Sequence, residues 1–327
     1  MSERVPIKHI SAAIRTAAQE VKENREAAAK GIQRALKCRW PKINNILLGG
    51  WTFRNQYAIC GASGSGKSYY LNLLYQDFCN QALNQKYPHK FIILHFNFEM
   101  ASSDEVLRTT STMSSLSYRK LISTDTPLGD GDYQKALEAM DKLKHAPIYF
   151  VEAVCTVQQI YETIKRVASK YPNRKLIIGL DHTLLTEMRN EGTEISLITH
   201  LSRMLLGVRK ELDSMNLLVC QLNSEIERPE RIANAHMHAP VKRDIHGAKA
   251  VYRDADFVAV LHAPEQLGIQ GYTANRYETK DLIAFHFLKG RKVPAGVMVR
   301  LRNELERGSL TQWAAEEGAM QLRLGVG

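Results

Sequence analysis

The segment that most constrains this chain reads GASGSGKS and runs from Gly61 to Ser68. It fits, without a mismatch, the pattern of a glycine, any four residues and then Gly-Lys-Ser or Gly-Lys-Thr. In this pattern backbone N–H groups turn inward around phosphates, the lysine places a positive charge on the terminal phosphates, and the hydroxyl ligates Mg²⁺. The sequence therefore predicts a site for a nucleoside triphosphate with Mg²⁺, formed by Gly61, Ala62, Ser63, Gly64, Ser65, Gly66, Lys67, Ser68 and Tyr69.

The residues on either side of this loop indicate the structure that carries it. Gln56 to Cys60 is an apolar, β-favouring stretch, and Tyr69 to Tyr75 continues with apolar residues at helical spacing. A strand, a glycine-rich loop and a helix in this order place the phosphates at the helix N-terminus. We therefore expect an α/β fold.

Composition limits the class of protein. The chain has 327 residues, 44% of them hydrophobic, which is enough for one large α/β domain or two smaller ones. Its 44 basic and 34 acidic residues give a net charge of +10, which suits nucleic acid but is shared by many other basic proteins. The five cysteines lack metal-ligand spacing, and the sequence shows neither a signal-type N-terminus nor an apolar run that would span a bilayer. We expect a soluble, cytoplasmic protein with reduced cysteines and no membrane partner.

The N-terminal region differs in composition from the rest. Residues 11–37 are rich in Ala, Gln, Glu, Lys and Arg, which predicts one or two mostly solvated helices that end at Trp40-Pro41. Such a helix either caps its own domain or packs as an arm on a neighbouring subunit, and the sequence does not choose between these. We divide the chain into an N-terminal helical arm or linker, residues 1–39, and a nucleotide-binding domain, residues 40–327.

Apolar runs predict the sheet. Those with the pattern of buried parallel strands are 91–96, 148–151, 176–180, 217–220, 257–261 and 282–287. Helical periodicity separates most of them, which is the order of a doubly wound fold. The last third instead reads as strands joined by turns. We therefore predict a mostly parallel, twisted sheet flanked by helices, with antiparallel strands at the C-terminal end.

Two carboxylates follow predicted strands, where the ligand crevice of a parallel sheet lies. Asp181 comes directly after the run 176–180, in the usual position of the carboxylate that holds Mg²⁺ through water. Glu99 lies just past the run 91–96 and is the candidate for polarising the attacking water. A glutamate that simply begins a helix is an equally good explanation of Glu99 from the residues alone.

Gln221 ends another strand and is a candidate sensor of the terminal phosphate. The segment after it, residues 224–245, is long and basic and resembles a mobile loop that faces a phosphodiester backbone. On composition alone, a solvated surface loop is the better explanation. The cations that would contact nucleic acid are Arg228, Arg231, Lys242 and Arg243.

Lys289 and Arg291 follow the run 282–287, and residues 294–296 form a turn before the next strand. Cations at the tip of a β-hairpin are well placed to reach a neighbour's triphosphate as an arginine finger, although an ordinary basic turn has the same pattern. A finger supplied in trans implies a ring or a filament.

These motifs, in this order, resemble the C-terminal motor domain of the DnaB-like replicative helicases, a branch of the RecA-like P-loop ATPases. The resemblance covers most of the chain from about Trp40 onward. It rests on the loop Gly61–Ser68 and on short motifs similar to those of the family: Leu48-Gly49-Gly50, Phe96-Asn97-Phe98-Glu99-Met100, Gln221-Leu222-Asn223, Asp254-Ala255-Asp256 and Lys289-Gly290-Arg291 followed by Pro294 and Gly296.

The resemblance implies an ATP-driven helicase or translocase that acts on single-stranded DNA in replication as a ring, as a rule a hexamer, with ATP and Mg²⁺ as cofactors. Glu99 would be the catalytic base, Asp181 the Mg²⁺-site aspartate, and Lys289 and Arg291 the residues that reach the adjacent nucleotide. Arg189 would join the DNA-binding cations. A primase or a loader is an implied partner. Because only about 40 residues precede the motor domain, we expect a reduced architecture in a bacterial cell, of the kind that a phage or mobile element encodes.

Two alternatives remain open at this point. The chain could be a RecA-like recombination ATPase that forms filaments on DNA. It could also be a regulatory ATP-binding module without motor activity, because residues 245–251 depart from the family pattern that precedes Asp254.

Overall fold

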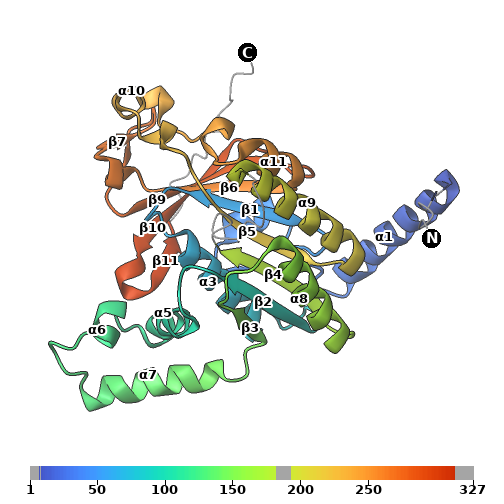
Figure 1. Cartoon of the computed structure of the whole chain (residues 1–327), viewed down its shortest axis with the longest axis horizontal. Helices are drawn as coiled ribbons and strands as arrows, with labels where there is room; N and C mark the ends of the chain where they lie inside the picture. The colour runs from blue at the N-terminus through green and yellow to red at the C-terminus, as the bar shows by residue number, and fades with distance from the viewer. Residues whose placement is uncertain (1–6, 8, 182–192, 314–327) are drawn as a thin grey trace.

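A nine-stranded mixed sheet organises the chain in the computed structural model, which describes residues 7, 9–181 and 193–313 (Figure 1). The strand order is β11-β10-β9-β6-β1-β5-β4-β2-β3. The strands are β1 Gln56–Gly61, β2 Phe91–Asn97, β3 Ile148–Val151, β4 Lys175–Asp181, β5 Met215–Gln221, β6 Phe257–His262, β9 Leu282–Gly290, β10 Val297–Glu304 and β11 Ser309–Gln312. Strands β1 to β6 pair in parallel, and β9, β10 and β11 complete the sheet in antiparallel pairing.

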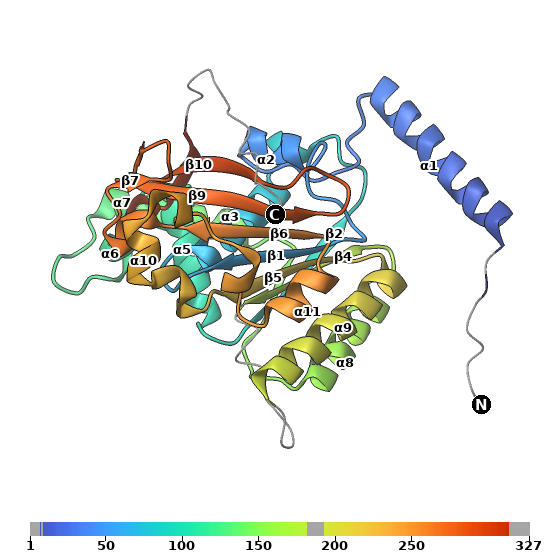
Figure 2. The same cartoon turned by 90° about the horizontal axis from the view of Figure 1, so that it is seen from above.

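Helices cover both faces of this sheet, as Figure 2 shows from above. The larger helices are α1 Ile10–Ala29, α3 Lys67–Cys79, α5 Ser102–Ser114, α7 Asp130–Leu143, α8 Val157–Lys170 and α9 Glu194–Leu212. The shorter ones include α2 Pro41–Ile46, α4 Gln81–Asn84, α6 Tyr118–Ile122, α10 Pro229–Ala233 and α11 Ala248–Asp254. The predicted α/β class, with a mostly parallel sheet and antiparallel strands at its C-terminal end, is confirmed.

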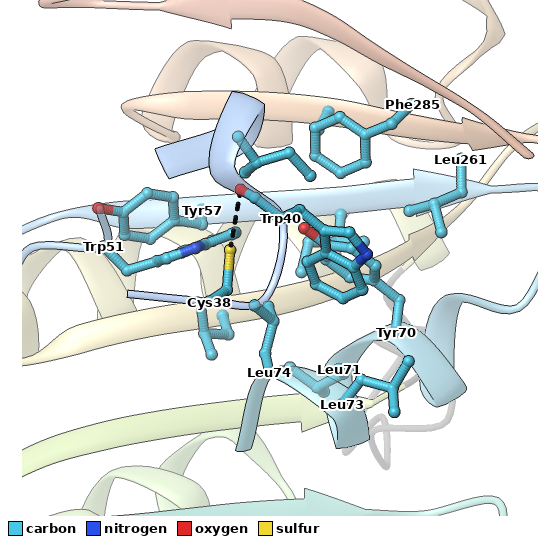
Figure 3. Packing of buried hydrophobic residues seen from close by; sticks show 14 of the residues in the cluster. Cys38, Trp40, Trp51, Tyr57, Tyr70, Leu71, Leu73, Leu74, Leu261 and Phe285 are labelled. Atoms are coloured by element: carbon cyan, nitrogen blue, oxygen red, sulfur yellow. Dashed lines mark hydrogen bonds between the residues drawn. The ribbon is translucent and has the colours of Figure 1, made fainter. Parts of the chain in front are cut away.

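Two hydrophobic cores lie on opposite faces of the sheet because strand side chains alternate in direction. In β1, Tyr57 and Ile59 belong to the core under α2 and α3, whereas Ala58 and Cys60 belong to the core under α8, α9 and α11. Figure 3 shows the first of these cores, in which Trp40 stacks on Tyr70 with ring centroids 4.6 Å apart. The sheet is thus buried on both sides, as the continuous apolar runs of its parallel strands predicted.

The run 282–287 corrects one expectation, because its pattern is that of a parallel strand and β9 is antiparallel to β6. Only the residues between Gly290 and Val297 join β9 to β10. Parallel neighbours need a crossover connection of a dozen or more residues, so this short turn requires a hairpin. The apolar run thus indicated that β9 is buried, and the short turn accounts for its antiparallel pairing with β10, as the predicted hairpin requires; the run alone does not show its direction relative to β6.

The N-terminal helix also differs from the prediction. Helix α1 ends at Ala29, just before Gly31 adopts a left-handed φ of +63°, and it extends away from the sheet (Figures 1 and 2). Trp40-Pro41 therefore does not end it, since Pro41 stands at the first position of α2, where proline suits a helix. Trp40 is fully buried, and its indole N–H donates to the Leu310 carbonyl of β11 at 2.8 Å.

The basic segment 224–245 folds into short helical turns rather than an extended loop. They are η2 Ser224–Glu227, α10, η3 Ala235–Met237 and η4 Lys242–Asp244. Two further pieces lie beside them, the turn η5 Pro264–Leu267 and a two-stranded ribbon of β7 Gly271–Tyr272 and β8 Tyr277–Glu278. The turn η6 Leu305–Arg307 joins β10 to β11.

Across the described ranges, none of the helices combines the length and the apolar character that crossing a membrane requires.

Candidate nucleotide site

The loop between β1 and α3 has the geometry that its glycines predicted. Gly64 and Gly66 adopt left-handed φ values of +74° and +84°, and Gly66 caps the N-terminus of α3. A Cβ on Gly61 would lie 2.3 Å from the Ser65 Oγ and 2.7 Å from the Leu261 carbonyl oxygen, so no side chain fits there. The backbone of this turn leads directly into a 13-residue helix whose first N–H groups lack helical partners. This arrangement favours phosphate binding.

An open pocket of about 260 Å³ lies against this loop. Nine residues that the sequence analysis selected line it together: Ser63, Gly64, Gly66, Lys67, Ser68, Tyr69, Glu99, Asp181 and Gln221. They meet because β1, β5, β4 and β2 are neighbours in the sheet, with Gly61 in register with Gln221 and Asn97 with Asp181. The carboxyl ends of the central parallel strands therefore form one wall of the pocket.

Lys67 is held at the base of the pocket. Its side chain is largely buried, and Nζ donates a 2.6 Å hydrogen bond to the carbonyl of Ala62. Burial lowers the pKa of Lys67, and the carboxylates of Asp181 and Glu99 act in the opposite direction. A phosphate in the pocket would add negative charge beside a cation that has lost much of its solvent, so the site favours an anion.

The residues fit a hydrated Mg²⁺ beside the phosphates. Ser68 in the first turn of α3 and Asp181 at the end of β4 both line the pocket, and they offer a hydroxyl and a carboxylate oxygen. Hard oxygen ligands of this kind are those that Mg²⁺ prefers when it also binds substrate phosphates.

Glu99 lies in the bend after β2, and its side chain is exposed to the pocket. The Asn97 side-chain oxygen accepts from the backbone N–H groups of Glu99 and Met100, at 3.4 and 3.1 Å, which holds the bend. Helix α5 begins only at Ser102 and has Asp104 and Glu105 as the acids of its first turn. The alternative that Glu99 begins a helix is therefore wrong.

Further pocket residues escaped the sequence analysis. Arg108 reaches the pocket from α5 and Leu305 from the turn after β10. Gln266, in the turn after β6, does not line the pocket but donates to the carbonyl of Gly64 in its glycine loop at 3.0 Å. These residues come from a helix and from turns that are distant in the sequence from the glycine loop and from the strand ends. For Arg108, the sequence signal that could have been used is a cation within the helix that follows Glu99.

Lys289 and Arg291 do not line this pocket. The Lys289 ammonium donates to the carbonyls of Tyr252, Arg253 and Ala255 at the end of α11. The Arg291 guanidinium donates to the Arg253 carbonyl at 3.0 Å and lies 3.5 Å from a carboxylate oxygen of Asp256. Both cations thus bind their own chain's helix terminus, where positive charge is favoured.

The predicted nucleic-acid cations divide into two groups. Arg231 requires correction, because it is buried, pairs with Asp244 at 2.5 Å and donates to the carbonyls of Met237 and Ala239. It holds the segment 224–245 together through these bonds, so Arg231 is not exposed for contact with nucleic acid.

The exposed cations of the segment are Arg228, Lys242 and Arg243. Arg228 also pairs with Glu225, and the Lys242 ammonium lies 4.9 Å from the centre of the Tyr252 ring. Arg189 lies outside the described residues.

Comparisons with known proteins agree with this geometry. The family model described as "DnaB-like helicase C terminal domain" matches residues 35–305. A search of curated proteins finds no match.

Solved structures share the fold at low sequence identity. One, described as an ATPase domain, superposes with a TM-score of 0.77 at 18% identity, over 94% of this chain and 100% of that one. A DnaB-like replicative helicase, solved to study its interactions with primase, gives 0.74 at 19% identity, over 94% of this chain and 67% of that one. A KaiC-like protein from the hyperthermophilic archaeon Pyrococcus horikoshii OT3 gives 0.51 at 15% identity, over 86% and 99%.

These matches confirm the RecA-like ATPase fold and a domain of replicative-helicase type. With a family model that spans most of its length, the chain belongs to the DnaB-like helicase C-terminal domain family.

Proposed function

We propose that this protein is an ATP-dependent DNA helicase or translocase that acts on single-stranded DNA as a ring of identical subunits, with a hexamer as the expected form. The observation that carries the proposal is the meeting of Lys67, Ser68, Glu99, Asp181 and Gln221 in one pocket against the glycine loop. A phosphate-binding cation, two hydroxyl or carboxylate metal ligands, a carboxylate base and an amide sensor are the groups that triphosphate hydrolysis requires.

Each side chain then has a stated role. The loop N–H groups and Lys67 bind the phosphates of ATP, and Ser68 and Asp181 hold Mg²⁺, which neutralises charge on the terminal phosphates. Glu99 accepts a proton from the attacking water, since its exposed carboxylate faces the pocket. Gln221 hydrogen-bonds the terminal phosphate and passes its presence to the segment that follows β5.

In the ring, Lys289 and Arg291 of one subunit would complete the nucleotide site of the next subunit. This requires the two side chains to exchange their contacts with the end of α11 for contacts with phosphate. Helix α1 supports assembly, because it leaves Ile10, Ile14 and Val21 exposed on a helix that extends from the domain. In this proposal residues 1–39 are the arm or linker and residues 40–327 the motor domain.

DNA would run along the exposed cations Arg228, Lys242 and Arg243, with Arg189 as a further candidate. Contacts of this kind go to phosphates, so affinity should fall steeply as salt rises. A primase or a loader is the proposed partner and the cytoplasm of a bacterial cell the proposed location, including a cell that carries a phage or mobile element.

A second candidate is an ATP-binding module that regulates partners without motor activity, because residues 245–251 depart from the family pattern that precedes Asp254. DNA-stimulated turnover distinguishes the two functions.

The first experiment is to measure ATP hydrolysis with and without single-stranded DNA, at low salt and at a protein concentration that permits assembly. Lys67→Ala serves as the inactive variant, and Lys144→Ala, which removes an exposed surface ion pair, as the matched control. Strong stimulation by DNA supports the motor. Nucleotide binding with slow turnover that ignores DNA supports the regulatory module, and a filament seen by electron microscopy would favour the recombination ATPase.

A further inference from the structure

A second cluster of ionisable side chains lies behind the nucleotide pocket. His95 of β2, Glu105 of α5 and Asp181 of β4 each bring one nitrogen or oxygen ligand atom to within 4.8 Å of the other two. The three side chains are 2%, 3% and 3% exposed, so the cluster is closed to bulk solvent. Asp181 belongs to both places, because it also lines the pocket beside Ser68.

Surrounding residues hold two of these side chains from behind. The Tyr75 hydroxyl of α3 hydrogen-bonds the His95 Nδ1 at 3.0 Å and lies over Gly179, where an added Cβ would come within 1.6 Å of it. The Asn72 side-chain N–H donates to one oxygen of Glu105 at 2.6 Å. Partners that orient a ligand from outside are typical of metal sites and fix the ligand's direction before the ion binds.

The second carboxylate oxygen of Glu105 has no hydrogen-bond donor in the cluster. This Oε1 is buried and makes no hydrogen bond within the described residues, and its nearest cation is the Arg108 guanidinium at 3.8 Å. A buried carboxylate oxygen without a hydrogen bond is costly. A second carboxylate within 4.8 Å adds repulsion that solvent cannot screen. Either a proton or a metal ion between the carboxyl groups would remove both costs.

The imidazole distinguishes these two possibilities. A shared proton needs only the carboxyl pair, whereas a neutral histidine beside two carboxylates completes a nitrogen and oxygen ligand set. Imidazole suits Zn²⁺ and related ions, and Mg²⁺ prefers oxygen alone. Three protein ligands with one position left open is a common Zn²⁺ arrangement.

We propose that His95, Glu105 and Asp181 form a binding site for a divalent transition-metal ion of the Zn²⁺ class, separate from the Mg²⁺ that accompanies the nucleotide. The ion would enter through the nucleotide pocket, since Asp181 is the ligand that faces it. The site does not depend on hydrolysis, DNA binding or assembly.

The test uses the full chain, without an affinity tag and free of nucleotide, titrated with Co²⁺ as a spectroscopic substitute for Zn²⁺. We expect one Co²⁺ per chain with visible d–d absorption, displaced by Zn²⁺ and not by millimolar Mg²⁺. Glu105→Gln and His95→Gln should each abolish the absorption. Tyr75→Phe, which keeps the ring and removes the bond to His95, should weaken binding by about 10-fold or more.

His236→Gln is the matched control, because His236 is exposed and distant in sequence from the cluster, and it should bind Co²⁺ as the wild type does. Circular dichroism verifies that each variant is folded. A wild-type protein that binds no Co²⁺ would overturn the proposal, as would binding that survives in folded Glu105→Gln and His95→Gln. Binding of a fluorescent ATP analogue, measured separately, reports on the nucleotide site whatever the metal result.

Discussion

The parallel and the antiparallel parts of the sheet use their polar side chains differently. In the parallel part, Lys67, Glu99 and Gln221 line an open pocket at the ends of adjacent strands. In the antiparallel part, Lys289 and Arg291 bond to carbonyls of their own chain, and His286 of β9 hydrogen-bonds the Tyr272 hydroxyl. Parallel strands bring their carboxyl ends to one edge and leave the side chains there for a ligand. The C-terminal strands use comparable side chains to hold the fold.

The largest expected effect comes from removing a side chain that lines the pocket of the parallel part. Lys67→Ala should reduce ATP hydrolysis below detection and weaken nucleotide binding, because it removes the cation that faces the phosphates. Turnover and the binding of a fluorescent analogue are the measurements. Retained turnover would contradict the assignment of the site.

Arg291→Ala tests whether the antiparallel part also serves a ligand. If Arg291 reaches a neighbour's nucleotide, turnover in the assembled protein should fall by about 10³-fold or more while nucleotide binding is kept. Lys292→Ala, one residue along and also exposed, is the control and should be unaffected. Normal turnover in Arg291→Ala would leave the residue with its structural contacts alone.

Lys289→Met measures the structural role directly. The variant loses the ammonium that binds three carbonyls at the end of α11, and we expect the free energy of unfolding to fall by about 1–3 kcal/mol. Lys280→Met, at an exposed position before β9, should change it by less than about 0.5 kcal/mol. Chemical denaturation of both variants gives the values, and equal stability would show that the three contacts contribute nothing.

The last prediction concerns a gradual effect, the change of stability with pH. His262 and His286 both hydrogen-bond the Tyr272 hydroxyl, at 2.8 and 2.7 Å, and burial lowers the pKa of each to about 3. Between pH 6.5 and about 3 the unfolded chain therefore binds protons that the folded chain does not, so stability falls as the pH falls. Each histidine contributes a slope of up to about 1.4 kcal/mol per pH unit.

His286→Gln should reduce that slope by one histidine's contribution, measured by denaturation at several pH values. Burial raises the pKa of Asp77 and Glu105, which gives a slope of the opposite sign, so the difference between variant and wild type is the quantity to compare. An unchanged slope would mean that His286 is protonated in the fold.

The sequence predicted the parallel part far better than the rest. The glycine loop, Asp181 and Gln221 could be placed because each is tied to a strand end by local pattern. The antiparallel pairing of β9 with β6 and the burial of Arg231 could not be predicted, because an apolar run does not show the direction of its neighbour and residue type does not show which distant aspartate it meets. The partners of Lys289 lie more than 30 residues away along the chain, and residue type alone does not show which carbonyls it meets.

The hydrogen bond between Trp40 and Leu310 joins residues 270 positions apart and links the first core to the edge strand β11. During synthesis at about 5–20 residues per second, Trp40 leaves the ribosome on the order of tens of seconds before its partner is made. Through that interval its indole N–H has no β11 carbonyl to bond, and the face of the sheet under α2 stays incomplete. The core beneath the phosphate loop is therefore completed by residues that the ribosome adds long after it has made the loop. We expect nascent chains that stop short of β11 to bind nucleotide poorly.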